Sequence, residues 1–458
     1  MQLIVQIVLA RLLAPSDFGA IAIVIVVVNV LNVFVQSGLN TALVQAKAVS
    51  KTDCDTVFWI SIIIAAVAYG FAYTCAPLLA SFYNIECLTA LIRVVSLLAF
   101  VNALNSVQIA LATRSLKTKR IFDSTIVACL VSGASSVTVA FLGGGVWSLA
   151  VQALLFQLVS AFVLFSSSDW HPGLNFSISR GRALFSFGWK ILASSLINAV
   201  YQGMYDLVIG KVFSASQLGL YSQGKKIPQI VCNIFDSAMR MTLISVSSRF
   251  QDDRESVKSI MKRAMTSSLF IVVPLLTMLL VCGNSLIPIV FGQQWTAAVP
   301  YMQVLCLSFM LWPIHTSNLQ VINAIGRSDV YLKLELMKKL LGVVILIMSV
   351  VFFDDLIYVV FGSLVAGVVG VFMNASPCKK LLDYSIAEQA KDCLPIFLIA
   401  GASGLVAYLI GLAVTDAILC MCLQAVTFVL FYFMLARLFK ISAFAYSIDL
   451  LSRVFKKE

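Results

Sequence analysis

The segment QIVLARLLAPSDFG at residues 6–19 returns without gaps as DLVIGKVFSASQLG at residues 206–219. Each copy ends an apolar stretch with a basic residue and then turns through a short polar segment into the next apolar stretch. The equivalent positions are Arg11 and Lys211, Ser16 and Ser216, and Gly19 and Gly219. Chance similarity among apolar residues would rarely place the same charged, glycine-containing turn in both copies. The sequence therefore predicts a duplicated architecture.

Two further matches extend the duplication along the chain. SGLNTALV at 37–44 pairs with SAMRMTLI at 237–244, and VQIALA at 107–112 pairs with LQVINA at 319–324. Because each half contains an even number of predicted membrane spans, both halves run in the same direction. That arrangement is a parallel repeat about an axis along the membrane normal, typical of transporters with a binding site between the halves near the midplane.

The composition excludes a soluble globular enzyme. Of the 458 residues, 60% belong to the hydrophobic set AVILMFWYC and only 12% are charged, with a mean hydropathy of +0.98. A soluble domain is about 45–50% apolar and about 25% charged. The apolar residues fall in stretches of about 20, the length that crosses ~30 Å of hydrocarbon. The expected fold class is all-α, a polytopic membrane protein with about fourteen transmembrane helices.

The predicted spans give the domain organisation directly. They are 1–13, 17–37, 56–81, 88–112, 122–141, 146–166, 184–211, 217–247, 264–282, 299–325, 334–353, 356–376, 393–413 and 417–436. The first is too short to cross a bilayer, so either the true chain starts upstream or the first helix is abnormally short. We expect an N-terminal six-helix bundle at 1–166, a cytoplasmic linker at 167–183, a C-terminal six-helix bundle at 184–376, two additional helices at 377–440 and an amphipathic cytoplasmic tail at 441–458.

Lysine and arginine are distributed unevenly over the loops. The chain carries 32 Lys and Arg against 21 Asp and Glu, a net charge of +11. Most of the basic residues fall in one set of alternate loops and in the C-terminal tail, whereas the opposite loops hold only Arg11 and Lys211. Cytoplasmic loops collect Lys and Arg, so both termini are expected in the cytoplasm. This bias accounts for the positive net charge, so nucleic-acid binding is not needed to explain it.

No pattern of residues predicts a metal site, a cofactor or an enzyme. The chain has only two histidines, and its eleven cysteines lie mostly inside apolar runs. Cys420 and Cys422 form a C-x-C sequence, but side chains two apart on a helix point ~200° from each other. Small packing residues are the better interpretation. The sequence contains no nucleotide-binding loop or catalytic triad, and the loops opposite the basic side are too short for a folded catalytic domain.

Four stretches carry a resemblance to a known family. They are spread in order over almost the whole chain: LARLLAPSDFG at 9–19, DLVIGKVFSASQLGLYSQGKKIPQ at 206–229, LWPIHTSNLQVINAIGRSDVYLKLELMKK at 311–339 and LLDYSIAEQAKDCLP at 381–395. With them the chain resembles the Wzx-type polysaccharide flippases, the polysaccharide transport family of the multidrug/oligosaccharidyl-lipid/polysaccharide (MOP) superfamily. Family members normally carry a full first helix, and this chain departs from them there.

The resemblance implies a MATE-like pair of six-helix bundles around a central cavity, working by alternating access. The implied cargo is an oligosaccharide repeat unit on undecaprenyl pyrophosphate, flipped across the bacterial cytoplasmic (inner) membrane for O-antigen, capsule or exopolysaccharide synthesis. Implied partners are this lipid-linked oligosaccharide, membrane lipid, H⁺ or Na⁺, and the polysaccharide polymerase and chain-length machinery. The alternatives are an ion-coupled multidrug exporter of the same superfamily, or a non-transporting scaffold or enzyme of polysaccharide assembly.

Charged residues inside spans are the candidate site, because burying charge in hydrocarbon is costly and usually functional. On the span at 217–247, Lys225, Asp236 and Arg240 fall within ~60° of one another on a helical wheel, and Lys226 lies ~100° from Lys225. We expect the two lysines to face the cavity and attract the pyrophosphate. Alternatively they snorkel to the outer interface, ~12 Å away along the helix.

The acidic candidates have alternative interpretations too. Asp236 and Arg240 either contribute to the cavity or, being spaced i, i+4, pair with each other. Asp206, at a position where an acidic residue is common in the family, is with Asp236 a candidate for coupling transport to H⁺ or Na⁺. It alternatively pairs with Lys211 or Lys225. Two further cations, Arg93 and Lys190, lie about six residues from a span end and either bind substrate or snorkel.

Neutral polar residues form two stripes. Asn29, Asn32 and Gln36 share one face of the second span, and Asn102, Asn105 and Gln108 share one face of the fourth. Such side chains often hydrogen bond between helices, at about 0.6 kcal/mol each. Packing between helices is the favoured interpretation of both stripes, and contact with sugars in a polar cavity is the alternative.

Overall fold

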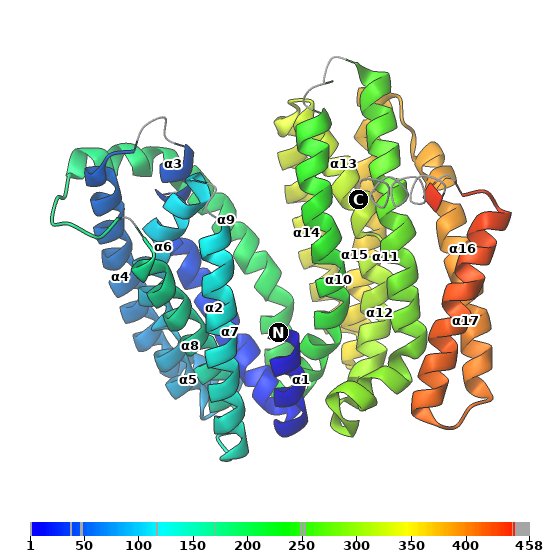
Figure 1. The fold of residues 1–458 in the computed structure, drawn as a ribbon, viewed down its shortest axis with the longest axis horizontal. Coiled ribbons are helices and arrows are strands. Elements are labelled where there is room, and N and C mark those ends of the chain that lie inside the picture. The colour runs from blue at the N-terminus through cyan, green and yellow to red at the C-terminus, as the bar shows by residue number, and fades with distance from the viewer. Residues whose placement is uncertain are drawn as a thin grey trace. The chain divides into compact units, whose positions relative to one another are not determined.

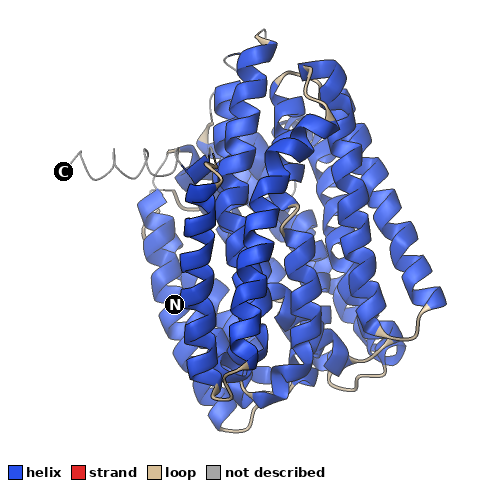
Figure 2. Cartoon of the chain, turned by 90° about the vertical axis from the view of Figure 1, so that its right-hand side faces the viewer, coloured by secondary structure: helices blue, strands red, loops and turns tan. Residues whose placement is uncertain are grey.

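The computed structural model describes residues 2–36, 39–45, 49–115, 118–168, 170–247, 250, 253–441 and 443–444. In these residues the chain forms helices joined by loops, without a strand (Figure 2). The contacts divide the chain into two compact units, Met1–Ser222 and Gln223–Glu458, called the first and second unit below. Apart from residues 443–444 and the residue Ile441, the predicted amphipathic tail lies outside the described residues.

The first unit is built from long helices with short connections (Figure 1). Within its described residues, α7 packs against α8, α4 against α5 and α6, and α9 against α2, α3 and α4. Its elements are α1 (Gln2–Leu12), α2 (Pro15–Gln36), α3 (Leu39–Gln45), α4 (Lys51–Tyr83), α5 (Leu88–Val95), α6 (Leu98–Arg114), α7 (Thr118–Phe141), α8 (Trp147–Ser166), α9 (Ile178–Val212) and the start of α10 (Ala215–Ser247).

The second unit is centred on α11, which packs against α12, α13, α15, α16 and α17. Its described elements are the rest of α10, α11 (Arg254–Phe291), the 3₁₀ helix η2 (Gln293–Ala298), α12 (Val299–Phe309), α13 (Trp312–Ala324), α14 (Ser328–Phe352), α15 (Leu356–Leu382), α16 (Ile386–Leu412) and α17 (Ala417–Leu438). The domain boundaries expected from the repeat stay a prediction; the contacts place α9 with the first unit.

Local sequence explains where the helices begin. Ser50 with Asp53 and Ser385 with Glu388 form capping boxes at the starts of α4 and α16, satisfying backbone N–H groups that have no partner inside the helix. Asp253 caps α11 by accepting hydrogen bonds from the hydroxyl and backbone N–H of Ser256. These bonds, from the Ser256 hydroxyl foremost, hold the pKa of the Asp253 carboxyl below its ordinary value.

The predicted spans coincide with these helices. Within the described residues, eleven helical stretches are long and apolar enough to cross a membrane, and the predicted membrane fold is confirmed. α1 is shorter, and α9 is long but more polar. α14 is long and apolar, but it carries three charged residues near its middle, Glu335, Lys338 and Lys339.

Two predicted spans are broken rather than continuous. The range 88–112 divides into α5 and α6 at Ser96–Leu97, and the range 299–325 divides into α12 and α13 at Met310–Leu311. In the second case Pro313 lacks a backbone donor and occupies the first turn of α13. The first break has no proline, and there the backbone tightens to i→i−3 bonding, with the Leu97 N–H donating to the Val94 carbonyl.

The repeated turns contact each other in the first unit. Gly19 of α2 lies against the carbonyl of Ala215, and Gly219 of α10 lies against the carbonyl of Pro15, so that a Cβ atom at either glycine would overlap a backbone oxygen. Pro15 and Ala215 are equivalent positions of the repeat, as are the two glycines. The two copies therefore cross each other at matching points, with backbone against backbone.

We expect Gly19→Ala and Gly219→Ala each to destabilise the protein by about 1–3 kcal/mol, the usual cost of inserting a methyl group into a closely packed contact. The measurement is the midpoint of thermal unfolding in detergent. Gly70→Ala and Gly401→Ala are matched controls, since both glycines lie within helices and a Cβ there meets nothing within 4 Å. Equal midpoints for all four variants would contradict the backbone contact.

Candidate functional site

Four of the predicted charged residues lie on α10, in the part that belongs to the second unit. Lys225 and Lys226 are both half-buried, and each interacts with other groups of the protein. Asp236 is half-buried and Arg240 exposed, nearer the C-terminal end of the helix. The two adjacent lysines are therefore packed charges, not side chains extended into open surroundings.

Asp236 and Arg240 form the ion pair that their spacing suggested. Nε of Arg240 lies 2.7 Å from Oδ2 of Asp236, and the Asp236 side chain is only 13% exposed. The other carboxylate oxygen of Asp236 accepts a hydrogen bond from the hydroxyl of Thr316 on α13. Asp236 thus joins α10 to α13 while its negative charge is balanced within its own helix.

A small pocket opens beside Asp236 in the second unit. Its volume accommodates about one water molecule, far too little for a sugar. Its lining is mostly apolar and comes from α10, α11 and α13: Cys232, Phe235, Asp236, Met239, Val272, Trp312 and Pro313. Among the residues that the structure describes, no three His, Cys, Asp or Glu side chains gather into a metal-binding group.

The remaining charged candidates lie in the first unit. Asp206 is half-buried on α9 and has interaction partners. Nζ of Lys211 donates to the carbonyl of Phe82 at 2.6 Å and lies 4.2 Å from the centre of its ring; no ion pair joins it to Asp206 in the described residues. The side chain of Lys190 lies outside the described part of the structure.

Arg93 of α5 lies against an aromatic ring. Its guanidinium carbon is 4.1 Å from the ring centre of Tyr73 on α4, in cation–π geometry. Nε of Arg93 is buried and has no hydrogen-bond partner among the described residues. Tyr73 contacts Tyr69, which in turn contacts Phe100 of α6. Arg93 is thus embedded at the edge of an aromatic cluster, and its two roles from sequence, binding and snorkelling, stay predictions.

Within the described part of the chain, one hydrogen bond joins the two polar stripes. Asn102 donates to Oδ1 of Asn32 at 2.6 Å and accepts a hydrogen bond from Gln157 of α8, which ties α6 to both α2 and α8. Asn105 is buried, and its Oδ1 has no hydrogen-bond partner in the described residues. Asn29 and Gln36 are exposed. Gln108 is also buried, and neither end of its amide has a hydrogen-bond partner in the described residues. The stripes therefore separate into interhelical contacts, buried amides without such a partner and exposed polar residues.

A buried carboxylate was missed in the sequence. Asp55 of α4 is fully buried, and its oxygens accept hydrogen bonds from the Trp170 indole at 3.2 Å, the Gly173 N–H at 3.1 Å and the Asn175 amide at 3.5 Å. Three donors compensate the charge that burial would otherwise penalise. The signal was the pair Asp53 and Asp55, because residues two apart lie ~200° around a helix and one of them has to face inward.

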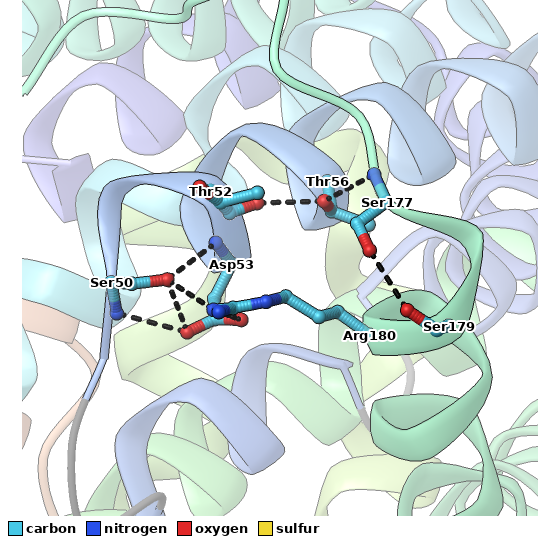
Figure 3. A network of polar contacts seen from close by, with 7 residues as sticks. All are labelled: Ser50, Thr52, Asp53, Thr56, Ser177, Ser179 and Arg180. Atoms are coloured by element: carbon cyan, nitrogen blue, oxygen red, sulfur yellow. Dashed lines mark hydrogen bonds and ion pairs between the residues drawn. The ribbon is translucent and has the colours of Figure 1, made fainter.

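The segment between α8 and α9, together with the start of α9, makes further contacts with the beginning of α4 (Figure 3). Arg180 of α9 forms an ion pair with Asp53 at 2.8 Å, next to the Ser50 cap, and the Ser177 N–H donates to the Thr56 hydroxyl at 3.2 Å. The described residues of the segment between α8 and α9, expected as a linker, are therefore packed on α4.

We expect Asn102→Leu to destabilise the first unit by about 1 kcal/mol, since it removes two interhelical hydrogen bonds at about 0.6 kcal/mol each. Thermal unfolding of the purified protein measures the loss. Asn29→Leu, an exposed residue of the same stripes, is the control and should leave the midpoint unchanged. An equal loss in both variants would show that the Asn32–Asn102–Gln157 contact is not what stabilises these helices.

Comparison with known proteins shows the family of the chain. Residues 8–300 match the family model described as "Polysaccharide biosynthesis protein". The chain is 24% identical over 374 residues to the lipopolysaccharide biosynthesis protein WzxC of Escherichia coli, covering 80% of this chain and 72% of that protein. It is 26% identical over 301 residues to the succinoglycan biosynthesis transport protein ExoT of Rhizobium meliloti, covering 66% of this chain and 61% of that protein.

Among solved structures, the fold is similar to the inward-facing conformation of a multidrug resistance MATE family transporter of the MOP superfamily. The TM-score is 0.66 at 16% identity, over 84% of this chain and 96% of that one. The likeness confirms the predicted MATE-like fold. Since the family model spans well over half of the sequence, the chain belongs to the polysaccharide biosynthesis protein family, as the resemblance to Wzx-type flippases led us to expect.

Proposed function

We propose that this protein is a flippase that carries lipid-linked oligosaccharide repeat units across the cytoplasmic membrane of a bacterium for cell-surface polysaccharide synthesis. The observation that carries the proposal is the pair of adjacent, half-buried lysines, Lys225 and Lys226, within an apolar helix of spanning length in a chain of this family. The names of relatives such as the succinoglycan biosynthesis transport protein support it.

The chemistry of the cargo explains why such residues are needed. A pyrophosphate and its sugars would lose their hydration in hydrocarbon, a prohibitive cost without polar partners. Two ammonium groups held part-way into the helix bundle replace that hydration by direct attraction. The protein then has no bond to make or break; it needs a polar path and two conformations in which the path opens to opposite sides.

The direct test is complementation. The chain is expressed in a bacterium that lacks its own polysaccharide flippase and carries the cognate biosynthetic genes. Recovery of surface polysaccharide together with loss of the stalled lipid-linked intermediate is expected. Continued accumulation of the intermediate, with the protein present in the membrane at normal level, would refute the flippase. Extrusion of a cationic dye without recovery of polysaccharide would favour a multidrug exporter instead.

The double variant Lys225→Ala, Lys226→Ala should lower polysaccharide export at least tenfold, because it removes both cations that attract the pyrophosphate. The matched control is Lys379→Ala, Lys380→Ala, another adjacent pair, which lies exposed in the last turn of α15. Export is compared at equal membrane levels of both variants. Export at the parental rate from the Lys225 and Lys226 variant would remove these residues from the transport path.

We further propose that Asp206 couples transport to H⁺ or Na⁺. Its support is the half-buried position of this carboxylate on α9. Asp206→Asn keeps the size of the side chain and removes its charge, so transport should lose its dependence on the pH or sodium gradient. A dependence that persists unchanged in this variant would exclude Asp206 as the coupling residue.

The orientation with both termini in the cytoplasm is part of the proposal and is supported by the distribution of Lys and Arg over the loops. The undecaprenyl carrier, and the polymerase and chain-length machinery that would act on the flipped product, belong to it as well. No bond-making activity is proposed for this chain.

A further inference from the structure

His315 occupies an unusual position in the second unit, on a helix that the proposed transport path has not used. It is half-buried on α13, and its Nδ1 lies 2.9 Å from the side-chain nitrogen of Asn374 on α15. The backbone carbonyl of Gly367, also on α15, lies within hydrogen-bonding reach of the same imidazole. A Cβ at Gly370 would be 3.0 Å from Cε1 of the ring, so glycine is what leaves room for it.

The orientation of the Asn374 amide bears directly on the protonation of the ring. An amide nitrogen only donates hydrogen bonds, so Nδ1 accepts and the imidazole is neutral, with its proton on Nε2. A protonated ring would place two N–H donors against each other. With the amide nitrogen facing Nδ1, His315 is therefore neutral.

Asn374 is left with an unsatisfied group in this arrangement. The residue is fully buried, yet its Oδ1 has no hydrogen-bond partner among the described residues. A buried acceptor without a donor is unfavourable and rare in folded proteins. Turning the amide by 180° would exchange Oδ1 and Nδ2, so that Oδ1 would accept from a protonated Nδ1. A proton on Nδ1 thus supplies a donor for Asn374 Oδ1, while Nδ2 moves to the place that Oδ1 occupied.

Among the described residues, the charges close to His315 come from α14 and α10. On α14, Lys338 lies near the ring and pairs with Glu335, Nζ to Oε1 at 2.6 Å. On α10, the Asp236–Arg240 pair contacts the neighbouring residue Thr316, and on α15 the groups that face the ring are neutral. A protonated His315 ring would therefore repel the Lys338 ammonium. The single negative charge of Glu335 balances one of these two cations but not both.

From these contacts we propose that His315, Asn374 and the Lys338–Glu335 pair form a proton-binding switch inside the second unit. One proton binds at Nδ1, the Asn374 amide turns to accept it, and Lys338 moves away from the new positive charge, which loosens the packing of α14 on α13. The site takes a proton and no other ligand. Its link to transport rests on the proposed function, whereas the proton binding itself does not.

The chain offers a direct test because it contains only two histidines. The other, His171, is exposed in the loop between α8 and α9, and His171→Asn leaves a single imidazole to observe. In the full chain with ¹⁵N-labelled histidine, reconstituted in lipid, NMR should show the Nε2-protonated tautomer at high pH. It should show one imidazolium transition on acidification, with a simultaneous shift of one side-chain amide. A ring that stays neutral down to pH ~4.5, two units below an ordinary histidine, would overturn the switch.

Matched variants on α14 test the electrostatic part. Lys338→Met removes the repelling cation, so His315 should bind its proton about tenfold more tightly. Glu335→Gln removes the compensating anion, so binding should weaken by a similar factor. Both side chains are partly exposed, and both variants are checked for a parental unfolding midpoint. Identical proton affinity in the two variants would contradict a role for the pair.

A transport experiment tests whether the switch is coupled to export. In a strain complemented by the parent chain, His315→Gln should abolish the dependence of export on external pH between 5.5 and 8, and His171→Asn should retain it. Unchanged pH dependence in His315→Gln overturns the coupling to transport. Failure of the parent chain to export at all would contradict the proposed function instead, and the NMR titration would still decide whether His315 binds the proton.

Discussion

Two places where backbone lies directly on backbone determine how the first unit is assembled. Gly19 of α2 touches the carbonyl of Ala215, and Gly219 of α10 touches the carbonyl of Pro15. Neither contact tolerates a Cβ atom, so both repeat copies need glycine at the same position. The repeat is therefore a contact as well as a pattern in the sequence. Because of this contact, α10 begins in the first unit, although the rest of the helix belongs to the second unit.

Buried polar side chains have no water to bond to, so their hydrogen bonds form within the protein. Asn102 bonds to Asn32 and Gln157, and Asp55 collects three donors from a loop more than one hundred residues away. In hydrocarbon such groups have to find partners within the protein. Asn374, like Asn105, has a buried oxygen without a hydrogen-bond partner among the described residues, and its nitrogen faces Nδ1 of His315. Polar groups whose hydrogen bonds are all formed favour a single conformation. A buried group that lacks a hydrogen bond can favour a second conformation in which that bond forms.

Sequence reasoning reached the spans, the repeat and the Asp236–Arg240 pair because each depends on local spacing. Hydropathy over about 20 residues identifies a span, and i, i+4 spacing brings two side chains together. It missed Asp55, whose partners Trp170, Gly173 and Asn175 are near only after folding. Of the two broken spans, Pro313 marks the break before α13, whereas the change to i→i−3 bonding at Leu97 leaves no residue signal. Contacts between residues far apart in the sequence, and small changes in backbone hydrogen bonding, could not be predicted from local spacing.

The charges of the second unit then divide into two kinds. Asp236 with Arg240, Lys258 with Glu388, Lys262 with Asp392 and Lys338 with Glu335 are pairs of opposite sign. Such pairs can stabilise packing with no cargo involved. Lys225 and Lys226 differ in being adjacent and of the same sign, although each also interacts with other groups of the protein. Two neighbouring positive charges repel each other, and under the proposed function an anionic cargo reduces that repulsion.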